Sequence, residues 1–237
     1  MTKLSVNINK IATLRNSRGG NVPDLLKFAV DVQGFGAEGI TIHPRPDQRH
    51  IRYQDVYDLK DLVHTEYNIE GNPIPEFMKM VLEVKPTQVT LVPDGNDVLT
   101  SNAGWDTIKH KDFLSDVVQE FQKQNIRTSI FVNPDLKMVE GVKLVGADRI
   151  ELYTEEYALQ YSKGNTQAIE PYKACAVLAQ ELEIGVNAGH DLNLKNVKFF
   201  KQNIPNLLEV SIGHALISES IYLGIENVVR MYLRELS

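Results

Sequence analysis

Short segments rich in β-branched and apolar residues recur along the chain, and segments with a helical spacing of apolar residues separate them. Residues 24–30 and 77–82, for example, repeat apolar side chains every three or four positions, which predicts amphipathic helices. The strand-like segments are 4–9, 39–43, 67–70, 88–92, 128–133, 149–153, 184–187 and 208–212. This alternation of strand and helix predicts parallel strands joined by crossover connections.

The number and spacing of these segments favour one closed barrel. Successive strands begin roughly 20 to 40 residues apart, which leaves room for one helix and two loops in each unit. The chain has 237 residues, and no stretch is rich enough in Gly, Ser or Pro to act as a flexible linker. We therefore predict an α/β protein in which residues 1–237 form a single (β/α)8 TIM barrel, the catalytic domain, with a parallel eight-stranded core and a few extra helices. A doubly wound open sheet is the main alternative.

Composition narrows the partners that this barrel is expected to have. Hydrophobic residues make up 43% of the chain and charged residues 24%, as in ordinary soluble proteins. The formal net charge of -6 disfavours nucleic-acid binding, which usually needs a basic face. The first residues run directly into the first strand, and no apolar run nears the roughly 20 residues of a membrane span. We expect a cytoplasmic protein with neither a nucleic-acid nor a membrane partner.

Polar and titratable residues gather where the predicted strands end. In a barrel of this kind the chemistry lies in the loops beyond the carboxyl ends of the strands. The residues at these ends are Asn7, Asn9, Lys10, His43, Arg45, Glu70, Glu151, Tyr153, Asn187, His190, Asp191 and His214. Burial and neighbouring charges bring the pKa of such carboxyl and imidazole groups towards neutrality, which suits proton transfer. The pattern predicts an active site at one rim of the barrel.

Glycines and arginines near the same rim indicate anionic ligands. Gly189 and Gly213 follow the last two strands, at the phosphate-binding corner of many barrels, although a glycine also serves a tight turn. Basic residues available for a second anionic group are Arg15, Arg18, Arg45 and Arg49. Two phosphorylated substrates are therefore expected. The long polar loop 93–106 has the composition of a lid, or of an ordinary surface excursion.

The residues alone leave other functions open. A Schiff-base aldolase would use Lys10 as its nucleophile. A metal-dependent sugar isomerase would use His43, Glu70 and His190, although no His-Glu-x-x-His spacing is present and we predict no metal site. A non-catalytic, phosphate-binding regulatory barrel would bind its ligands without turning them over.

Several longer motifs narrow these possibilities. Residues 7–18, 39–45 with 49–51, 186–190 and 212–215 closely resemble the pyridoxine 5'-phosphate synthase family, and the likeness runs nearly end to end. The resemblance implies a barrel without a cofactor. The resemblance implies that this barrel condenses 3-amino-2-oxopropyl phosphate with 1-deoxy-D-xylulose 5-phosphate to pyridoxine 5'-phosphate, phosphate and water. It also implies a homo-oligomer, specifically an octamer.

The resemblance further implies a role for each matching residue. His43 and Glu70 would accept protons, His190 would donate one, and Glu151 would stabilise cationic intermediates. The amino-ketone phosphate would be bound by Asn7, Arg18, Gly213 and His214, with Asp191 beside them. The deoxyxylulose phosphate would be bound by Asn9, Lys10, Arg45, His50 and Thr100.

Three positions depart from the usual family pattern. Many members have Asp-His where this chain has Asn9-Lys10, and Gly in place of Asp191. An amide is no base, so we expect Asn9 only to form hydrogen bonds, whereas Lys10 still meets a phosphate or hydroxyl as a point charge. A carboxylate at position 191 would repel phosphate. We therefore predict that Asp191 faces the ammonium group of the amino-ketone.

Overall fold

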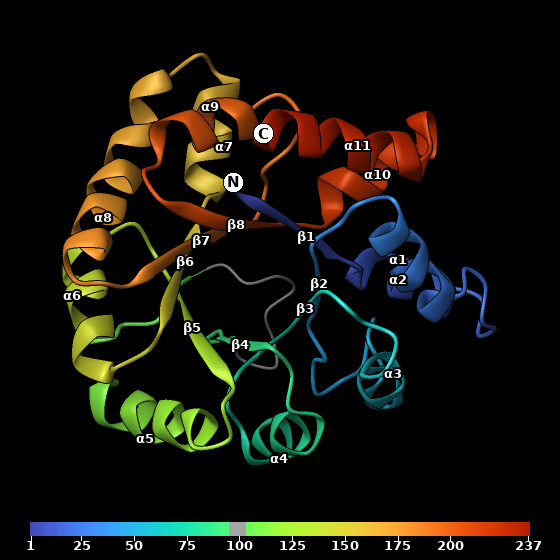
Figure 1. The fold of residues 1–237 in the computed structure, drawn as a ribbon, viewed down its shortest axis with the longest axis horizontal. Coiled ribbons are helices and arrows are strands. Elements are labelled where there is room, and N and C mark those ends of the chain that lie inside the picture. The colour runs from blue at the N-terminus through green and yellow to red at the C-terminus, as the bar shows by residue number, and fades with distance from the viewer. Residues whose placement is uncertain (95–102) are drawn as a thin grey trace.

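The computed structural model describes residues 1–94 and 103–237, and its strands form a closed barrel (Figure 1). The strands are β1 Lys3–Asn7, β2 Gly39–Ile42, β3 Glu66–Gly71, β4 Gln88–Leu91, β5 Arg127–Val132, β6 Arg149–Tyr153, β7 Gly185–Gly189 and β8 Leu207–Ile212. Each strand pairs in parallel with the next, and β8 pairs with β1. The predicted TIM barrel is confirmed, and the open sheet is excluded.

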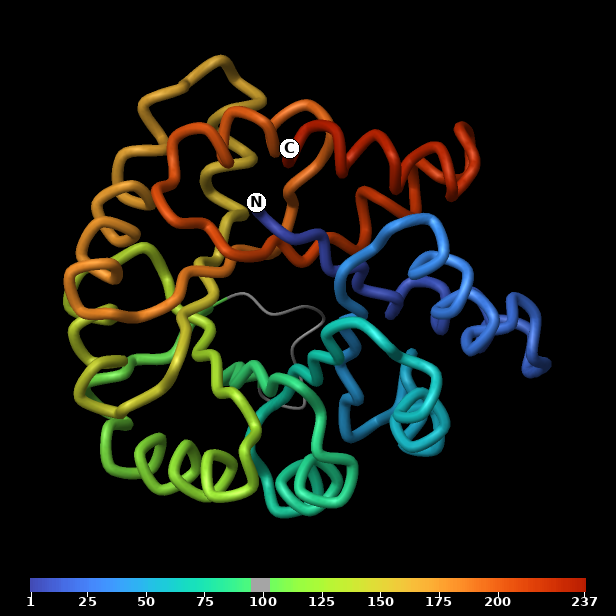
Figure 2. The backbone as a smooth tube through the Cα atoms, in the orientation of Figure 1, coloured from blue at the N-terminus to red at the C-terminus, as the bar shows by residue number. Residues whose placement is uncertain are grey.

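The helices surround this barrel, as the backbone trace shows (Figure 2). They are α1 Asn9–Asn16, α2 Leu25–Gly34, α3 Tyr53–Leu59, α4 Pro75–Val84, α5 Lys111–Gln122, α6 Leu136–Val145, α7 Glu155–Ser162, the 3-10 helix η1 Thr166–Ile169, α8 Glu170–Glu181, α9 Val197–Asn203, α10 His214–Leu223 and α11 Ile225–Leu236. The connections after β1, β6 and β8 each carry two α-helices, which accounts for the predicted extra helices. Within the described ranges, no helix combines the length and apolar character needed to cross a membrane.

The predicted ends of the first and seventh strands are each wrong by two residues, since β7 extends to Gly189 and not 187, and the first of these errors bears on the site. The prediction extended the first strand to residue 9, but β1 ends at Asn7 and α1 begins at Asn9. The Asn7 side-chain oxygen accepts a hydrogen bond from the Asn9 backbone N–H at 3.1 Å. This local turn competes with extension of the strand. Asn9 and Lys10 therefore lie in the first turn of a helix.

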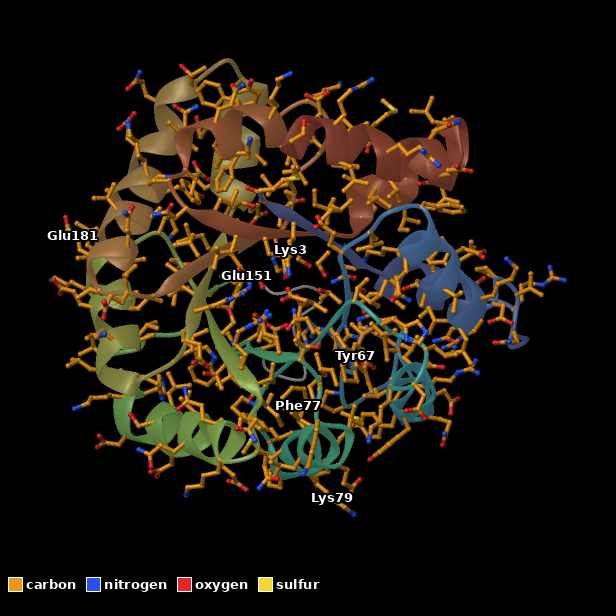
Figure 3. The ribbon with its side chains drawn as sticks, in the orientation of Figure 1. Lys3, Tyr67, Phe77, Lys79, Glu151 and Glu181 are labelled. Carbon is orange, nitrogen blue, oxygen red and sulfur yellow. The ribbon has the colours of Figure 1, made fainter. Side chains whose placement is uncertain are left out.

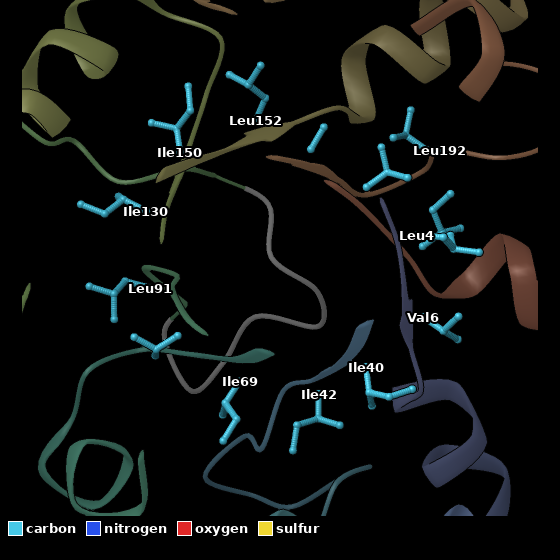
Figure 4. Close-up of a cluster of buried hydrophobic side chains, with 14 of the residues drawn as sticks. Leu4, Val6, Ile40, Ile42, Ile69, Leu91, Ile130, Ile150, Leu152 and Leu192 are labelled. Atoms are coloured by element: carbon cyan, nitrogen blue, oxygen red, sulfur yellow. The ribbon is translucent and has the colours of Figure 1, made fainter. Parts of the chain in front are cut away.

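Side chains alternate between the two faces of each strand, and the apolar ones lie outside the barrel. Figure 4 shows residues such as Leu4, Ile40, Ile69 and Ile130 arranged around the strands, and each of these four is fully buried. They pack between the sheet and the surrounding helices. The main hydrophobic core is thus a sleeve around the barrel, and its burial fixes which residues face the lumen.

The lumen itself is filled by a polar network. Ser5 and Thr41 hydroxyls lie 2.7 Å apart, and the Asn68 amide nitrogen donates to Thr41 at 3.3 Å. The hydroxyl of Thr90 and the amide of Gln88 both donate to the Asn68 oxygen, at 3.0 and 3.2 Å. Buried polar groups are tolerated because they satisfy one another in this way. The middle layer of the barrel is therefore polar, where TIM barrels usually carry branched apolar residues.

A charged group closes the amino-terminal end of the lumen. We name it the basal cluster; its members are Lys3, Glu66, Arg127, Arg149 and Glu209. Glu66 forms salt bridges with Lys3 at 3.3 Å and Arg127 at 3.1 Å. A hydrogen bond from Glu209, followed by the charges of Arg127 and Lys3, holds the pKa of Glu66 at about 2 despite its burial, whereas burial raises the pKa of Glu209 well above its usual value. Figure 3 shows Lys3 and Glu151 near the barrel axis, and Lys79 and Glu181 on the outer helices.

Candidate active site

A cavity of about 560 Å³ opens at the carboxyl ends of the strands. Its walls come from β1, β2, β3, β6, β7 and β8 and the loops that follow them. The sequence-predicted residues that line it are Asn7, Asn9, Lys10, His43, Arg45, Arg49, His50, Glu70, Glu151, Tyr153, His190, Asp191, Gly213 and His214. Residues far apart in the sequence thus meet in one place, as the strand-end pattern predicts. We call His43, Glu70, Glu151 and His190 the catalytic rim.

His43 follows β2 and is buried, with 6% of its surface exposed. Its backbone N–H donates to the Asn9 side-chain oxygen at 2.9 Å, so the amide at position 9 fixes the backbone that carries the imidazole. Burial lowers the pKa of His43 well below its usual value, and Arg45 and the neighbouring histidines lower it further. His43 is therefore neutral at physiological pH, the form that accepts a proton.

The two rim carboxyls come from strands β3 and β6. Burial raises the pKa of Glu70 well above its usual value, and the nearby charge of Glu151 raises it further. Burial alone raises the pKa of Glu151 to about 7. Two buried carboxyls that repel each other share protons at neutral pH. The site therefore contains a carboxyl that both binds and releases protons in the physiological range.

Gly189 and Gly213 are needed because side chains pack directly against them. A Cβ atom at position 189 would lie 2.3 Å from a carboxylate oxygen of Glu151, and one at 213 would lie 3.0 Å from Cβ of Asn7. Gly213 also immediately precedes α10, so the free N–H groups of that helix begin at the cavity wall. These glycines therefore place a carboxylate and an anion-binding helix end against the ligand space.

His190 lies at the exit of β7 in an unusual backbone conformation. Both His190 (φ 77°) and Asp191 (φ 58°) are left-handed, which costs about 1 to 2 kcal/mol for each non-glycine residue. The imidazole packs against the rings of Phe131 and Tyr153, at centroid distances of 4.8 and 5.3 Å. Its Nδ1 atom is buried and has no hydrogen-bond partner in the described structure. Burial lowers the pKa of His190 to about 4, against a raising effect from Glu155.

The two arginines on the wall of the cavity near α1 are paired with carboxylates. Arg45 is buried and its guanidinium binds the Asp94 carboxylate at 2.5 Å. Arg49 binds Asp47 at 2.7 Å. Burial lowers the pKa of the intervening His50 to about 4, and the charges of Arg45 and Lys10 contribute. This wall carries an excess of positive charge near the first turn of α1.

The prediction for Arg15 as an anion-binding residue is wrong. Its guanidinium is buried and donates to both carboxylate oxygens of Asp55, at 2.7 and 2.8 Å. It also donates to the carbonyl of His50 at 3.2 Å. Arg15 thus joins α1 to α3 and supports the loop that carries Arg49 and His50.

Of the remaining predicted residues, one described residue is not brought to this cavity. Arg18 lies in an exposed turn after α1 and does not line it. Thr100 lies outside the described residues, as does most of the predicted lid 93–106, of which 95–102 are not described.

Glu155 and Ser211 line the cavity but were not predicted as site residues. Ser211 lies in β8 and Glu155 is the first residue of α7, directly after β6. The Tyr153 hydroxyl donates a short hydrogen bond to the Glu155 carboxylate. The strand-end rule that identified Glu151 and His190 applies equally to Glu155, so its signal was present in the sequence.

The arrangement combines proton acceptors, proton donors and anion-binding groups in one cavity. Neutral His43 accepts a proton, whereas protonated Glu70 or Glu151 donates one. In the part of the chain that the structure describes, no three His, Cys, Asp or Glu side chains come together in a geometry suited to a metal ion. The geometry therefore supports acid–base chemistry on an anionic substrate.

Comparison with known proteins gives consistent results. Residues 4–237 match the family model described as pyridoxal phosphate biosynthesis protein PdxJ. The pyridoxine 5'-phosphate synthase of Flavobacterium johnsoniae is 69% identical over 236 residues, covering 100% of both chains. The protein of that name from Christiangramia forsetii is 61% identical over 234 residues, covering 99% of both.

Solved structures of other enzymes share the fold at low sequence identity. 3-Keto-L-gulonate-6-phosphate decarboxylase from Vibrio cholerae superposes with a TM-score of 0.68 at 9% identity, covering 99% of this chain and 97% of that one. A monomeric form of phosphoribosylanthranilate isomerase from Thermotoga maritima gives a TM-score of 0.64 at 13% identity, covering 100% and 98%. These matches support the barrel fold alone.

Proposed function

The chain belongs to the pyridoxal phosphate biosynthesis protein PdxJ family, and from this premise we propose that it is a pyridoxine 5'-phosphate synthase. The enzyme condenses 3-amino-2-oxopropyl phosphate with 1-deoxy-D-xylulose 5-phosphate, and it releases pyridoxine 5'-phosphate, phosphate and water. The observation that carries the proposal is the catalytic rim, which places two imidazoles and two carboxyls of altered pKa in one cavity. We propose no cofactor and no metal for this reaction.

The proposed roles within the rim are those that the family pattern implies for the matching residues. His43 accepts protons from carbon or nitrogen as the two substrates join, and Glu70, which its raised pKa keeps protonated in the empty cavity, accepts one after it has released its own. His190, which its lowered pKa leaves neutral at physiological pH, takes up a proton during the reaction and donates it to a departing oxygen. Glu151 lies across the cavity and balances positive charge on imine intermediates. Imine formation, phosphate loss, ring closure and dehydration each need such transfers, so several acid–base groups in one cavity suit the chemistry.

We propose that the two phosphates bind at the two helix ends that meet the cavity. The amino-ketone phosphate lies at α10, where Asn7, Gly213 and His214 line the wall, with Asp191 beside its ammonium group. Arg18 is assigned to the same substrate on the family pattern. The deoxyxylulose phosphate lies at the first turn of α1. Its proposed ligands are Asn9, Lys10, Arg45, His50 and Thr100. Holding both substrates in one cavity removes much of the entropic cost of their encounter.

The remaining features of the proposal concern the whole molecule. Residues 1–237 would act as one catalytic domain, in the cytoplasm, as a homo-oligomer and specifically an octamer. The exposed apolar side chains of Ile221, Tyr222 and Leu223 at the end of α10 support an interface, because such a patch is costly to leave in water. Native mass spectrometry measures the number of subunits directly, and a monomer would contradict this part of the proposal.

The experiment that tests the function mixes both phosphorylated substrates with the purified protein. We expect pyridoxine 5'-phosphate and free phosphate to appear in equal amounts, without added cofactor, and in the presence of a chelator. A borohydride-trapped adduct on Lys10 with a ketose phosphate alone would instead support an aldolase. Tight binding of both substrates without any product would support a regulatory barrel.

A further inference from the structure

The exit of β7 is held by an unusual set of side-chain hydrogen bonds. His190 and Asp191 both have left-handed backbones, and neither is a glycine. A backbone of this kind needs support from its surroundings. The support comes from β6 and α7 on one side and from the loop after β7 on the other.

Thr154, between β6 and α7, supplies the first part of that support. Its side chain is fully buried, and its single hydroxyl proton is shared between the Gly189 carbonyl at 2.8 Å and, over a shorter distance, the His190 carbonyl. Its backbone N–H donates to the Gly189 carbonyl as well, at 3.1 Å. A single residue thereby joins the strand that carries Glu151 to the residue that carries the rim imidazole.

The position of Thr154 makes this use of its hydroxyl notable. Thr154 is the N-cap residue of α7, where a threonine oxygen usually accepts a hydrogen bond from its own helix. In this structure the side chain makes no such capping bond and turns to the carbonyls at the exit of β7. Thr154 thus uses its hydroxyl for a contact with the end of the neighbouring strand β7 and not for its own helix.

The loop beyond His190 is held independently. The side-chain amides of Asn193 and Asn196 both donate to the carbonyl of Asp191 at 3.2 Å. The Tyr157 hydroxyl donates to the Asn196 carbonyl at 2.8 Å. Removal of the Thr154 hydroxyl therefore leaves the rest of the loop anchored, and its effect falls on the peptide of His190.

We propose that Thr154 is a positioning residue, whose hydroxyl sets the backbone of His190 and so aims its imidazole into the cavity for proton transfer. This inference rests on the proposed function for its catalytic consequence. The imidazole has stacking neighbours, Phe131 and Tyr153, but no hydrogen bond from its buried Nδ1 in the described structure. A hydrogen bond with the Gly189 backbone is a further contact of the ring, so its orientation in the unliganded protein depends on packing and on the backbone at residues 189 and 190.

The test compares Thr154→Val with Thr154→Ser. Valine keeps the shape of threonine and removes the hydroxyl, whereas serine keeps the hydroxyl and removes a methyl group. Thr107→Val is the matched control, because Thr107 is also fully buried and donates to a backbone carbonyl, that of Met138 at 2.8 Å, away from the cavity.

We expect Thr154→Val to lower kcat by roughly 10- to 100-fold, the scale of a small displacement of a catalytic group, with KM for both substrates unchanged. Thr154→Ser recovers most of the turnover, and Thr107→Val keeps wild-type kcat. Equal losses in Thr154→Val and Thr107→Val, or wild-type turnover in Thr154→Val, would overturn the inference.

A second measurement does not depend on activity. In unliganded protein with isotope-labelled histidine, the ring signals of His190 are identified by their absence from His190→Gln. Thr154→Val should shift or broaden these signals, and Thr154→Ser should restore them. Unchanged His190 signals in Thr154→Val would contradict the positioning role. An inactive wild-type protein would contradict the proposed function, and this spectrum would still decide the role of Thr154.

Discussion

The two ends of the barrel lumen both carry buried titratable residues, but the pKa values of Glu66 at one end and Glu151 at the other are shifted in opposite directions. In the basal cluster Glu66 binds Lys3 and Arg127, and these cations help to hold its pKa far below neutrality. In the catalytic rim the pKa values of Glu70 and Glu151 are raised, that of Glu151 to about 7. Glu66 is thus a fixed charge at one end and Glu151 a proton carrier at the other, while burial raises the pKa of Glu209, which keeps the proton that it donates to Glu66.

The difference shows how the pKa of a buried carboxyl depends on the neighbouring groups that stabilise its charge. A carboxylate whose neighbours outweigh its burial, as Glu209 and the cations do for Glu66, stays ionised and ties strands together, whereas one whose burial outweighs its neighbours keeps its proton. The basal cluster is therefore expected to contribute to stability and the catalytic rim to turnover. The following substitutions test that division, starting with the largest expected effect.

A substitution in the catalytic rim should lower the activity of the enzyme without lowering its stability. Glu70→Gln removes the ionisable group and keeps the shape of the side chain, so we expect kcat to fall roughly 100- to 10,000-fold, the usual contribution of a general acid or base. Thermal unfolding at neutral pH should stay unchanged or improve. Glu76→Gln on the exposed face of α4 is the control and should leave both properties as they are. Wild-type turnover in Glu70→Gln would remove Glu70 from the mechanism.

The basal cluster should show the reverse. Arg127→Met removes the salt bridge to Glu66 and the hydrogen bond to Gln88 at 2.9 Å, which leaves a partly buried carboxylate with one fewer cation. We expect the free energy of unfolding in urea to fall by roughly 3 kcal/mol, with kcat near wild type at low temperature. Lys27→Met breaks an exposed pair with Asp31 and should cost no more than about 0.5 kcal/mol. If Arg127→Met lowered kcat and left stability intact, the division would be wrong.

The raised pKa of Glu151 should also make the folded protein less stable as pH rises. The pKa of Glu151 is about 7 in the folded protein against an ordinary value of 4.5, so the folded state binds the extra proton between these values and loses stability as pH rises through that window. Glu151→Gln lacks this loss. Its stability relative to wild type should therefore grow between pH 4.5 and 8, by up to about 3 kcal/mol. The depressed histidines His43 and His190 are present in both proteins and cancel in the difference. A difference that does not vary with pH would contradict the raised pKa.

Asp191 should give the smallest effect, because its side chain is exposed at the cavity mouth. Asp191→Gly removes the carboxylate proposed to face the substrate ammonium, so we expect the Kd for 3-amino-2-oxopropyl phosphate to rise up to about fivefold, as for an exposed ion pair. Binding of 1-deoxy-D-xylulose 5-phosphate, measured by calorimetry, should not change. Unchanged affinity for the amino-ketone would show that Asp191 faces elsewhere.

The sequence was sufficient to predict the barrel and the location of the site. Strand and helix alternate regularly, and the strand-end rule places His43, Glu70 and His190 at one rim. The rule works because every parallel strand points its carboxyl end the same way. The alternation of apolar and polar residues in the strands also fixes the sleeve-like core, once the register between strands is known.

What the sequence could not supply was the partner of each polar group. Arg15 has the same local character as Arg49, but one binds Asp55 in the interior and the other lines the cavity. Asn9 continues an apolar segment, but its backbone N–H donates a hydrogen bond to the Asn7 side-chain oxygen, and the strand ends before it. Glu209 reads as an ordinary strand residue, but the β1–β8 pairing brings it opposite Lys3. Pairings of this kind depend on tertiary register, which no local pattern encodes.

The most direct test of this account is the titration of Glu151 itself. In protein labelled with ¹³C at the glutamate carboxyl groups, NMR spectra across pH 3 to 9 report each carboxyl separately, and Glu151→Gln identifies the signal. We predict a titration midpoint of about 7 for Glu151. The Glu66 carboxyl at the other end of the lumen should stay ionised down to about pH 2, so its signal should not move across this range. Midpoints for both residues near the ordinary value of 4.5 would contradict the central claim.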